Sequence, residues 1–172
     1  MIDPAICNVA IDANALDRPK GDPARGRMVE RLLALRDAGR LTLIVPHGVL
    51  AEVQRPATPD NVRTAVNGGI YTIKTSLTED ERCRRQTITR VLQGNAKPGR
   101  HAADAEHLAE AAKYGGYFIT HDERILKRSH GLADVLGPAL QVVTLVDFLR
   151  IYDAFHPDDG SKPFEQVRGG SR

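Results

Sequence analysis

The chain lacks several features that would assign it quickly to a class of protein. Its 172 residues include no tryptophan, only 5% aromatic residues and only two cysteines. Cys7 lies in an apolar stretch and Cys83 in a charged one, so their spacing matches neither a metal-binding nor a redox motif. We therefore expect both to be reduced thiols of a cytoplasmic protein.

Long apolar runs and an excess of charge of one sign are also missing. No stretch approaches the roughly 20 apolar residues that a membrane-spanning helix needs, and residues 1–10 lack the basic start and apolar run of a signal peptide. The 24 Lys and Arg nearly balance the 22 Asp and Glu, for a formal net charge of +2. We therefore expect no membrane partner, and nucleic-acid binding would depend on local clusters of charge.

Length and composition predict one ordinary globular domain. A chain of this size with 41% hydrophobic residues can bury one core but is too short for two domains of average size. We expect the domain to span residues 1–155. Residues 156–172 are polar and are expected to form a mobile C-terminal tail.

Short apolar runs alternate with segments of helical periodicity along the chain. Strands are expected at 7–11, 41–45, 117–120 and 140–144, with a short extended piece at 70–73; helices are expected at 28–38, 48–55, 78–93, 102–113 and 145–155. Residues 19–25 and 56–69 have the composition of loops. Because parallel strands need crossover connections, this pattern predicts the α/β class, with a mostly parallel central sheet flanked by helices on both faces.

Three acidic residues occur where an α/β sheet places its ligands, beyond the carboxyl ends of the strands. Asp12 follows the first strand, Glu52 lies in the helix after the second, and Asp122 follows the 117–120 strand. Each has an ordinary alternative: Asp12 as a turn residue, Glu52 as an exposed helix charge and Asp122 as an N-cap. Only the set as a whole points to a site.

Asp104 adds a fourth carboxylate at the start of the 102–113 helix. It lies among alanines, close to the apolar face, whereas Glu110 and Lys113 are expected to face solvent. A buried carboxylate needs a partner, and no basic residue is an obvious local candidate. Two carboxylates about 4 Å apart repel by about 4 kcal/mol at an effective dielectric constant of about 20, so converging acids predict a cation. All-oxygen ligands suit Mg²⁺ or Mn²⁺, while the paired histidines or thiolates expected of zinc are missing.

Four segments together give the sequence a resemblance to a known family. Val9-Ala10-Ile11-Asp12-Ala13-Asn14, Val49-Leu50-Ala51-Glu52, the helix with Asp104, and Phe118-Ile119-Thr120-His121-Asp122 resemble, in order and spacing, the PIN domain family, which includes the VapC-type toxins. The match covers roughly residues 7–150. Its most specific part is the Asp104 helix that leads into Thr120-x-Asp122.

The resemblance implies a metal-dependent endoribonuclease. In that family the positions of Asp12, Glu52, Asp104 and Asp122 are catalytic metal ligands for Mg²⁺ or Mn²⁺, and those of Asn14 and Thr120 support them. The implied reaction is hydrolysis of RNA phosphodiester bonds by a metal-activated water. The implied partners are an RNA substrate, the cognate antitoxin of a toxin-antitoxin pair and a second copy of the chain. No residue is assigned to substrate binding.

The chain departs from the family pattern at three places. Ala13 replaces a small hydroxyl residue often found there, which removes a supporting hydrogen bond but no ligand. The segment between Glu52 and Asp104 and the C-terminal tail are both longer than in the compact toxins. Two other functions stay open. One is a non-catalytic or partner-silenced nucleic-acid-binding module of PIN-like fold. The other is a phosphatase-type hydrolase with Asp12 as nucleophile, which Asn14 disfavours because a second acid is expected there.

Overall fold

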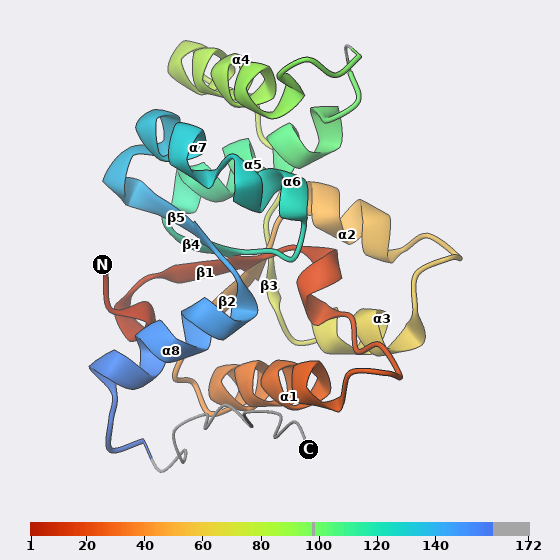
Figure 1. Cartoon of the computed structure of the whole chain (residues 1–172), viewed down its shortest axis with the longest axis vertical. Coiled ribbons are helices and arrows are strands. Elements are labelled where there is room, and N and C mark those ends of the chain that lie inside the picture. The colour runs from red at the N-terminus through yellow and green to blue at the C-terminus, as the bar shows by residue number, and fades with distance from the viewer. Residues whose placement is uncertain (98, 160–172) are drawn as a thin grey trace, which may run out of the picture.

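The computed structural model describes residues 1–97 and 99–159 (Figure 1). The expectation of a mobile tail falls mostly on residues outside this range. Along the described chain the elements are η1 (Pro4–Ile6), β1 (Asn8–Ile11), η2 (Ala13–Leu16), α1 (Pro23–Asp37), β2 (Thr42–Val45), α2 (His47–Val53), α3 (Asp60–Val66), β3 (Ile70–Tyr71), α4 (Glu79–Gln93), α5 (Ala102–Tyr114), β4 (Gly116–Ile119), α6 (Glu123–Lys127), α7 (Ser129–Leu136), η3 (Gly137–Ala139), β5 (Leu140–Val143) and α8 (Leu145–Phe155).

The strands form one five-stranded sheet in the order β3-β2-β1-β4-β5. Every pairing is parallel; Val9, for example, lies opposite Leu43 on one side and Tyr117 on the other. Gly116 allows β4 to start close to β1, because a Cβ on this residue would lie 1.9 Å from the backbone oxygen of Asn8. The predicted α/β class with a parallel sheet is confirmed.

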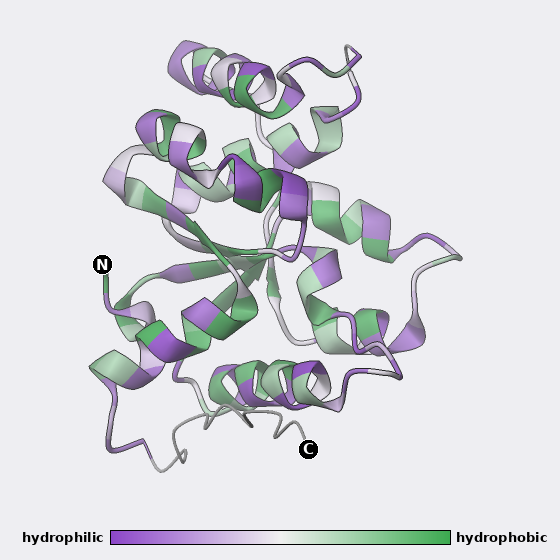
Figure 2. Ribbon diagram, in the orientation of Figure 1, coloured by the Kyte–Doolittle hydropathy of each residue, from purple (hydrophilic) through white to green (hydrophobic). Residues whose placement is uncertain are grey.

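Helices cover both faces of the sheet (Figure 1). Alternate strand residues such as Val9 and Ile11 join α1, α3 and α8 in one core, while Ala10 and Phe118 join α4, α5 and α7 in the other. In Figure 2 the sheet is mainly hydrophobic, whereas the helices carry both hydrophobic and hydrophilic residues. Burial on both faces explains why the central strands are continuous apolar runs without alternation.

Two expected loops contain helix. Helix α1 begins at Pro23, inside the region interpreted as a loop, because Asp22 accepts a hydrogen bond from the backbone N–H of Arg25 at 3.0 Å and proline suits the first helical position. Helix α3 lies within residues 56–69. Its buried face, which includes Val62 and Val66, packs near η2. This tertiary contact stabilises the helix, but the turn-like residues at both of its ends made the segment look like a loop.

Other boundaries agree with the sequence. Helix α4 starts with the expected capping box, in which Thr78 and Glu81 each accept a hydrogen bond from the other's backbone N–H, and α8 spans the predicted residues. After α8, His156 contacts Asp3 at 2.7 Å and Asp159 pairs with Arg40 at 2.8 Å. Among the described residues no helix combines the length and apolar character required to cross a membrane.

Candidate functional site

The candidate site lies where the strand order reverses. Strands β2 and β4 lie on opposite sides of β1, and the crossover connections therefore diverge beyond the carboxyl end of β1, which is where open α/β sheets bind ligands. Asp12 follows β1 directly, and its backbone N–H bonds to Ile119 O at 3.0 Å. Thr120 follows β4 in the same way, so both side chains are placed at the switch point by the sheet itself.

A network of hydrogen bonds holds the Asp12 side chain. Its Oδ2 accepts bonds from Asn14 Nδ2 and Thr120 Oγ1, each at 2.8 Å. Asn14 Oδ1 accepts the backbone N–H of His121 at 2.8 Å, and Thr120 Oγ1 accepts that of Asp122 at 3.0 Å. The structure thus places the side chains of Asn14 and Thr120 in direct contact with the Asp12 carboxylate.

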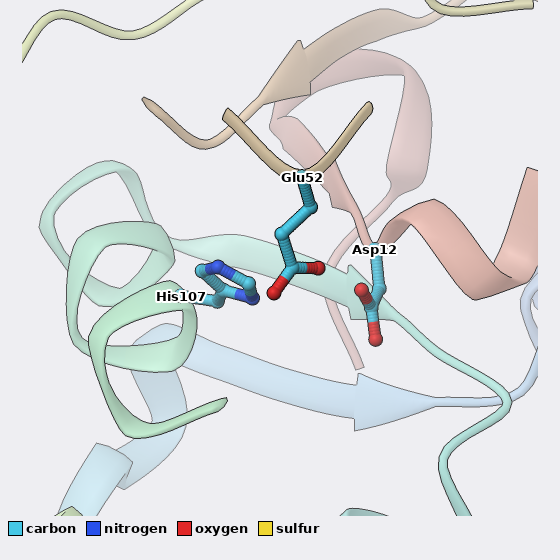
Figure 3. Close-up of side chains that lie close together, drawn as sticks. All are labelled: Asp12, Glu52 and His107. Carbon is cyan, nitrogen blue, oxygen red and sulfur yellow. The ribbon is translucent and has the colours of Figure 1, made fainter. Parts of the chain in front are cut away.

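Glu52 and His107 face Asp12 across a small gap (Figure 3). One ligand atom of each of the three residues lies within 4.8 Å of the other two. Asp12 is 7% exposed and His107 4% exposed. The Glu52 and His107 side chains also interact electrostatically with the Asp12 carboxylate. Two carboxylates and an imidazole therefore lie close enough together for one ion to contact all three.

Contacts between α2 and α5 position Glu52 and His107. Gly48 of α2 lies so close to His107 that a Cβ there would be 2.5 Å from the ring Cδ2, so only glycine fits this contact. Glu110 of α5 accepts the backbone N–H of His47 at 2.9 Å and the hydroxyl of Thr72. Glu110 was expected to face solvent; it instead binds the start of α2, because the free N–H groups there favour an acidic partner.

Lys113 was also expected to face solvent, and this too is wrong. Its ammonium group lies 3.4 Å from the Glu81 carboxylate and donates a hydrogen bond to Thr75 at 2.8 Å. These contacts join α5 to the first turn of α4 and to the segment after β3. Periodicity within α5 could not reveal them, because they depend on how neighbouring elements cover its polar side.

The pKa of Asp12 is raised above its ordinary value. Burial is the main cause, and the nearby charges of Glu52 and Asp104 add to it; the Thr120 hydrogen bond and the charge of His107 act in the opposite direction. A buried carboxylate beside other acids is an unfavourable arrangement in the absence of a cation. A divalent ion would reverse that balance.

Asp104 and Asp122 have a different environment, dominated by Arg124. The Arg124 guanidinium pairs with the Asp122 carboxylate, with Nε at 3.0 Å from Oδ1, and lies 4.0 Å from Asp104 Oδ2. Asp104 also contacts His101 Nδ1 at 3.3 Å. The expectation that Asp104 has no local basic partner is therefore wrong: His101 precedes it by one helical turn, and Arg124 arrives from α6.

Asp122 also adopts the alternative role that its position suggested. Its Oδ1 accepts the backbone N–H of Arg124 at 2.8 Å, which makes it the N-cap of α6. The side-chain hydrogen bond from Arg124 is the main reason why the pKa of Asp122 is lowered. The four acids predicted from sequence thus divide into two pairs, Asp12 with Glu52 and Asp104 with Asp122.

Sequence reasoning missed His107 as a member of the site. It follows Asp104 by three positions, so both lie on one side of α5, and this spacing was the available signal. Two carboxylates and an imidazole are suitable ligands for a divalent cation, so Asp12, Glu52 and His107 could hold one. The chemistry of the donors fits the metal that the PIN resemblance implies.

A groove runs beside Glu52 on the outer side of the site. It has a volume of about 370 Å³ and is lined by Asn14, Glu52, Arg55, Thr58 and neighbouring residues. On another side, Arg25 donates a hydrogen bond to the Asn14 backbone oxygen. Arg55 and Arg25 thus bring positive charge to two sides of the site, beside the acidic Glu52 and Asp17 of the groove.

Comparison with protein-family models, with curated proteins and with solved structures gave no match to this chain. The parallel α/β fold and the arrangement at the end of β1 are thus established by the structure alone. The PIN resemblance continues to depend on the residues that carry it.

Proposed function

We propose that this protein is a metal-dependent endoribonuclease with a PIN-like domain, in which Asp12 and Glu52, together with His107, hold a divalent cation. The observation that carries the proposal is the meeting of three ligand atoms within 4.8 Å at the switch point of a parallel sheet. The burial of Asp12 beside Glu52 supports it, because a buried carboxylate next to a second acid is unfavourable without a cation.

The residues around the cation would perform distinct tasks. Asn14 and Thr120 orient the Asp12 carboxylate through hydrogen bonds to its Oδ2. A bound divalent ion supplies an activated water and offsets charge on the leaving oxygen. The groove beside Glu52 gives a polynucleotide access from solvent, and Arg55 on its wall provides a positive charge for a phosphate.

The nitrogen of His107 bears on which metal is preferred. Mg²⁺ strongly favours oxygen ligands, whereas an imidazole suits transition metals. The acidic residues alone predicted either Mg²⁺ or Mn²⁺. With His107 as a third ligand, we favour Mn²⁺ over Mg²⁺. The proposal also includes a cognate antitoxin and self-association, both of which derive from the resemblance. It includes a cytoplasmic location, which derives from the free thiols Cys7 and Cys83.

One observation favours a second function, a non-catalytic or partner-silenced nucleic-acid-binding module. Arg124 engages Asp122 and approaches Asp104, which are metal ligands in the family pattern. If catalysis requires all four acids free, the domain would bind RNA without cutting it.

The test of the leading proposal is RNA cleavage with a parallel measurement of metal binding. Labelled single-stranded and hairpin RNAs of mixed sequence are incubated with Mn²⁺ and the full chain, the Asp12→Asn variant or the Glu52→Gln variant. Cleavage should fall at least about 100-fold in both variants, since even residues that merely orient ligands cost 10–100-fold. Asp60→Asn is the matched control, because the Asp60 side chain is 95% exposed.

The outcomes separate the two functions. Metal-dependent cleavage that both variants lose supports the nuclease. Mn²⁺ binding that depends on Asp12, together with RNA binding but intact RNA, supports the non-catalytic module. Cleavage that persists at the same rate in Asp12→Asn contradicts the proposed site.

A further inference from the structure

Among residues 1–97 and 99–159, Arg124 is the one basic side chain that lies between two of the predicted metal ligands, Asp104 and Asp122. It lies in the first turn of α6, where Asp122 is the N-cap. Its guanidinium pairs with the Asp122 carboxylate through both Nε and a terminal nitrogen, and the same terminal nitrogen reaches to 4.0 Å from Asp104. The Arg124 guanidinium thus lies close to two carboxylates, Asp104 in α5 and Asp122 in the segment after β4.

The position of Arg124 matters because a second divalent ion would need the same two carboxylates, Asp104 and Asp122, as its ligands. A guanidinium stays charged at every pH at which the protein is folded, and its planar fork binds a carboxylate through two parallel contacts. A second ion placed between Asp104 and Asp122 would have to displace Arg124 or lie against it. Repulsion between the two cations makes joint occupancy unfavourable.

The remaining ligands still suffice for one ion. Asp12, Glu52 and His107 form a group that Arg124 does not contact in the structure, and Asp12 interacts with Asp104 only through charge. Asp104 and Asp122 therefore have a positive partner already, whereas Asp12 and Glu52 have none of comparable strength.

We infer that Arg124 occupies the place of a second metal ion, so that this site takes a single divalent cation, and that Asp104 and Asp122 serve to hold Arg124. The inference rests on the proposed function, because it presupposes a metal at Asp12. It changes the role expected for Asp104 and Asp122 from metal ligands to positioning residues.

The experiment is the stoichiometry of Mn²⁺ binding to the full chain, measured by calorimetry at saturation. The wild-type protein should bind one equivalent. Arg124→Gln removes the positive charge and should bind a second equivalent. Arg124→Lys keeps the charge and should remain at one. Two equivalents in the wild type, or one in Arg124→Gln, overturns the inference.

Lys127→Gln provides a matched control on the same helix. Lys127 pairs with Glu123 at 2.8 Å, so its loss removes the same charge without touching Asp104 or Asp122, and the stoichiometry should stay at one. Circular dichroism establishes that each variant is folded, which is expected because the Arg124 side chain is 52% exposed.

A double variant, Asp104→Asn with Asp122→Asn, approaches the question from the other side. It should still bind one equivalent of Mn²⁺, and a loss of all binding contradicts the inference even if Arg124→Gln cannot be purified. Failure of the proposed function looks different: the wild type then binds no Mn²⁺, or Asp12→Asn binds it equally well.

Discussion

Replacement of Asp12 by asparagine should make the metal-free protein more stable. The nearest oxygens of Asp12 and Glu52 lie within 4.8 Å, which corresponds to a repulsion of about 3.5 kcal/mol at an effective dielectric constant of about 20. Glu52 is only partly buried, so solvent reduces this value. The side-chain oxygen of asparagine can still accept the bonds from Asn14 and Thr120, and its NH₂ group can donate to Glu52. We expect a gain of about 1 to 3 kcal/mol.

The gain should depend on pH with a defined sign. Because the pKa of Asp12 is raised in the folded protein, the folded chain holds a proton that the unfolded chain has released. Stability of the wild type is therefore lost as pH rises from the ordinary pKa of an aspartate through the raised value. The advantage of Asp12→Asn should be full at pH 7.5 and should vanish below about pH 3.5. The lowered pKa of Asp122 destabilises both proteins equally in acid.

Mn²⁺ should reverse the order of stability. A ligand present at about 1,000 times its Kd stabilises the folded state by about 4 kcal/mol, and only the wild type should receive this gain. Unfolding is followed by circular dichroism with EDTA or with Mn²⁺. For a chain of this size each kcal/mol shifts the Tm by about 2–4 °C. Asp60→Asn should match the wild type within about 0.5 kcal/mol.

Two results would refute this reasoning. If Asp12→Asn is less stable than the wild type in EDTA at pH 7.5, then the carboxylates do not repel each other as the geometry requires. If Mn²⁺ stabilises both proteins equally, then Asp12 is not a ligand. A gain that is constant from pH 3.5 to 7.5 would assign the effect to hydrogen bonding instead of charge.

The remaining predictions concern His107 and the glycine that packs on it. His107→Gln should weaken Mn²⁺ binding by about 10- to 100-fold and Mg²⁺ binding less, as measured by calorimetry; unchanged Mn²⁺ binding would show that the imidazole is not a ligand. Gly48→Ala places a methyl group 2.5 Å from the His107 ring and should weaken Mn²⁺ binding similarly. Gly26→Ala, in α1 with nothing within 4 Å of the added Cβ, should leave binding unchanged and stabilise the helix by up to about 1 kcal/mol.

The fold could largely be predicted from the sequence, because the local signals for strands and helices match the segments that are buried in the structure. The apolar runs of β1, β2 and β4 are buried on both faces, and the capping box at Thr78 marks the start of α4 without reference to any other segment. The start of α1 and the whole of α3 and α7 were missed. For α3 the stabilising contacts are with η2, more than forty residues earlier in the chain, and prolines at its N-terminal end concealed it.

The candidate site was predictable only in part, and the reason is geometric. Asp12 follows a strand end, a position fixed by the topology of any parallel sheet. His107 and Arg124 reach the site through contacts between helices, α5 with α2 for His107 and α6 with α5 for Arg124. The approach of α5 to α2 depends on Gly48, and the arrival of Arg124 depends on how α6 turns after its N-cap. Sequence spacing shows that His107 shares a side of α5 with Asp104 and that Arg124 is near Asp122, but it does not show that α2 faces His107 or that Arg124 reaches Asp104.

The hydrogen bond between Thr120 and Asp12 links residues 108 positions apart, and this separation bears on the lifetime of the protein. The three candidate ligands come from separate parts of the chain, so an unfolded chain cannot bring them together. A bound ion would therefore stabilise only the folded state. Scarcity of metal would then increase the population of open molecules accessible to proteases. Under the proposed function, the cellular supply of the ion would set the amount of this protein as well as its activity.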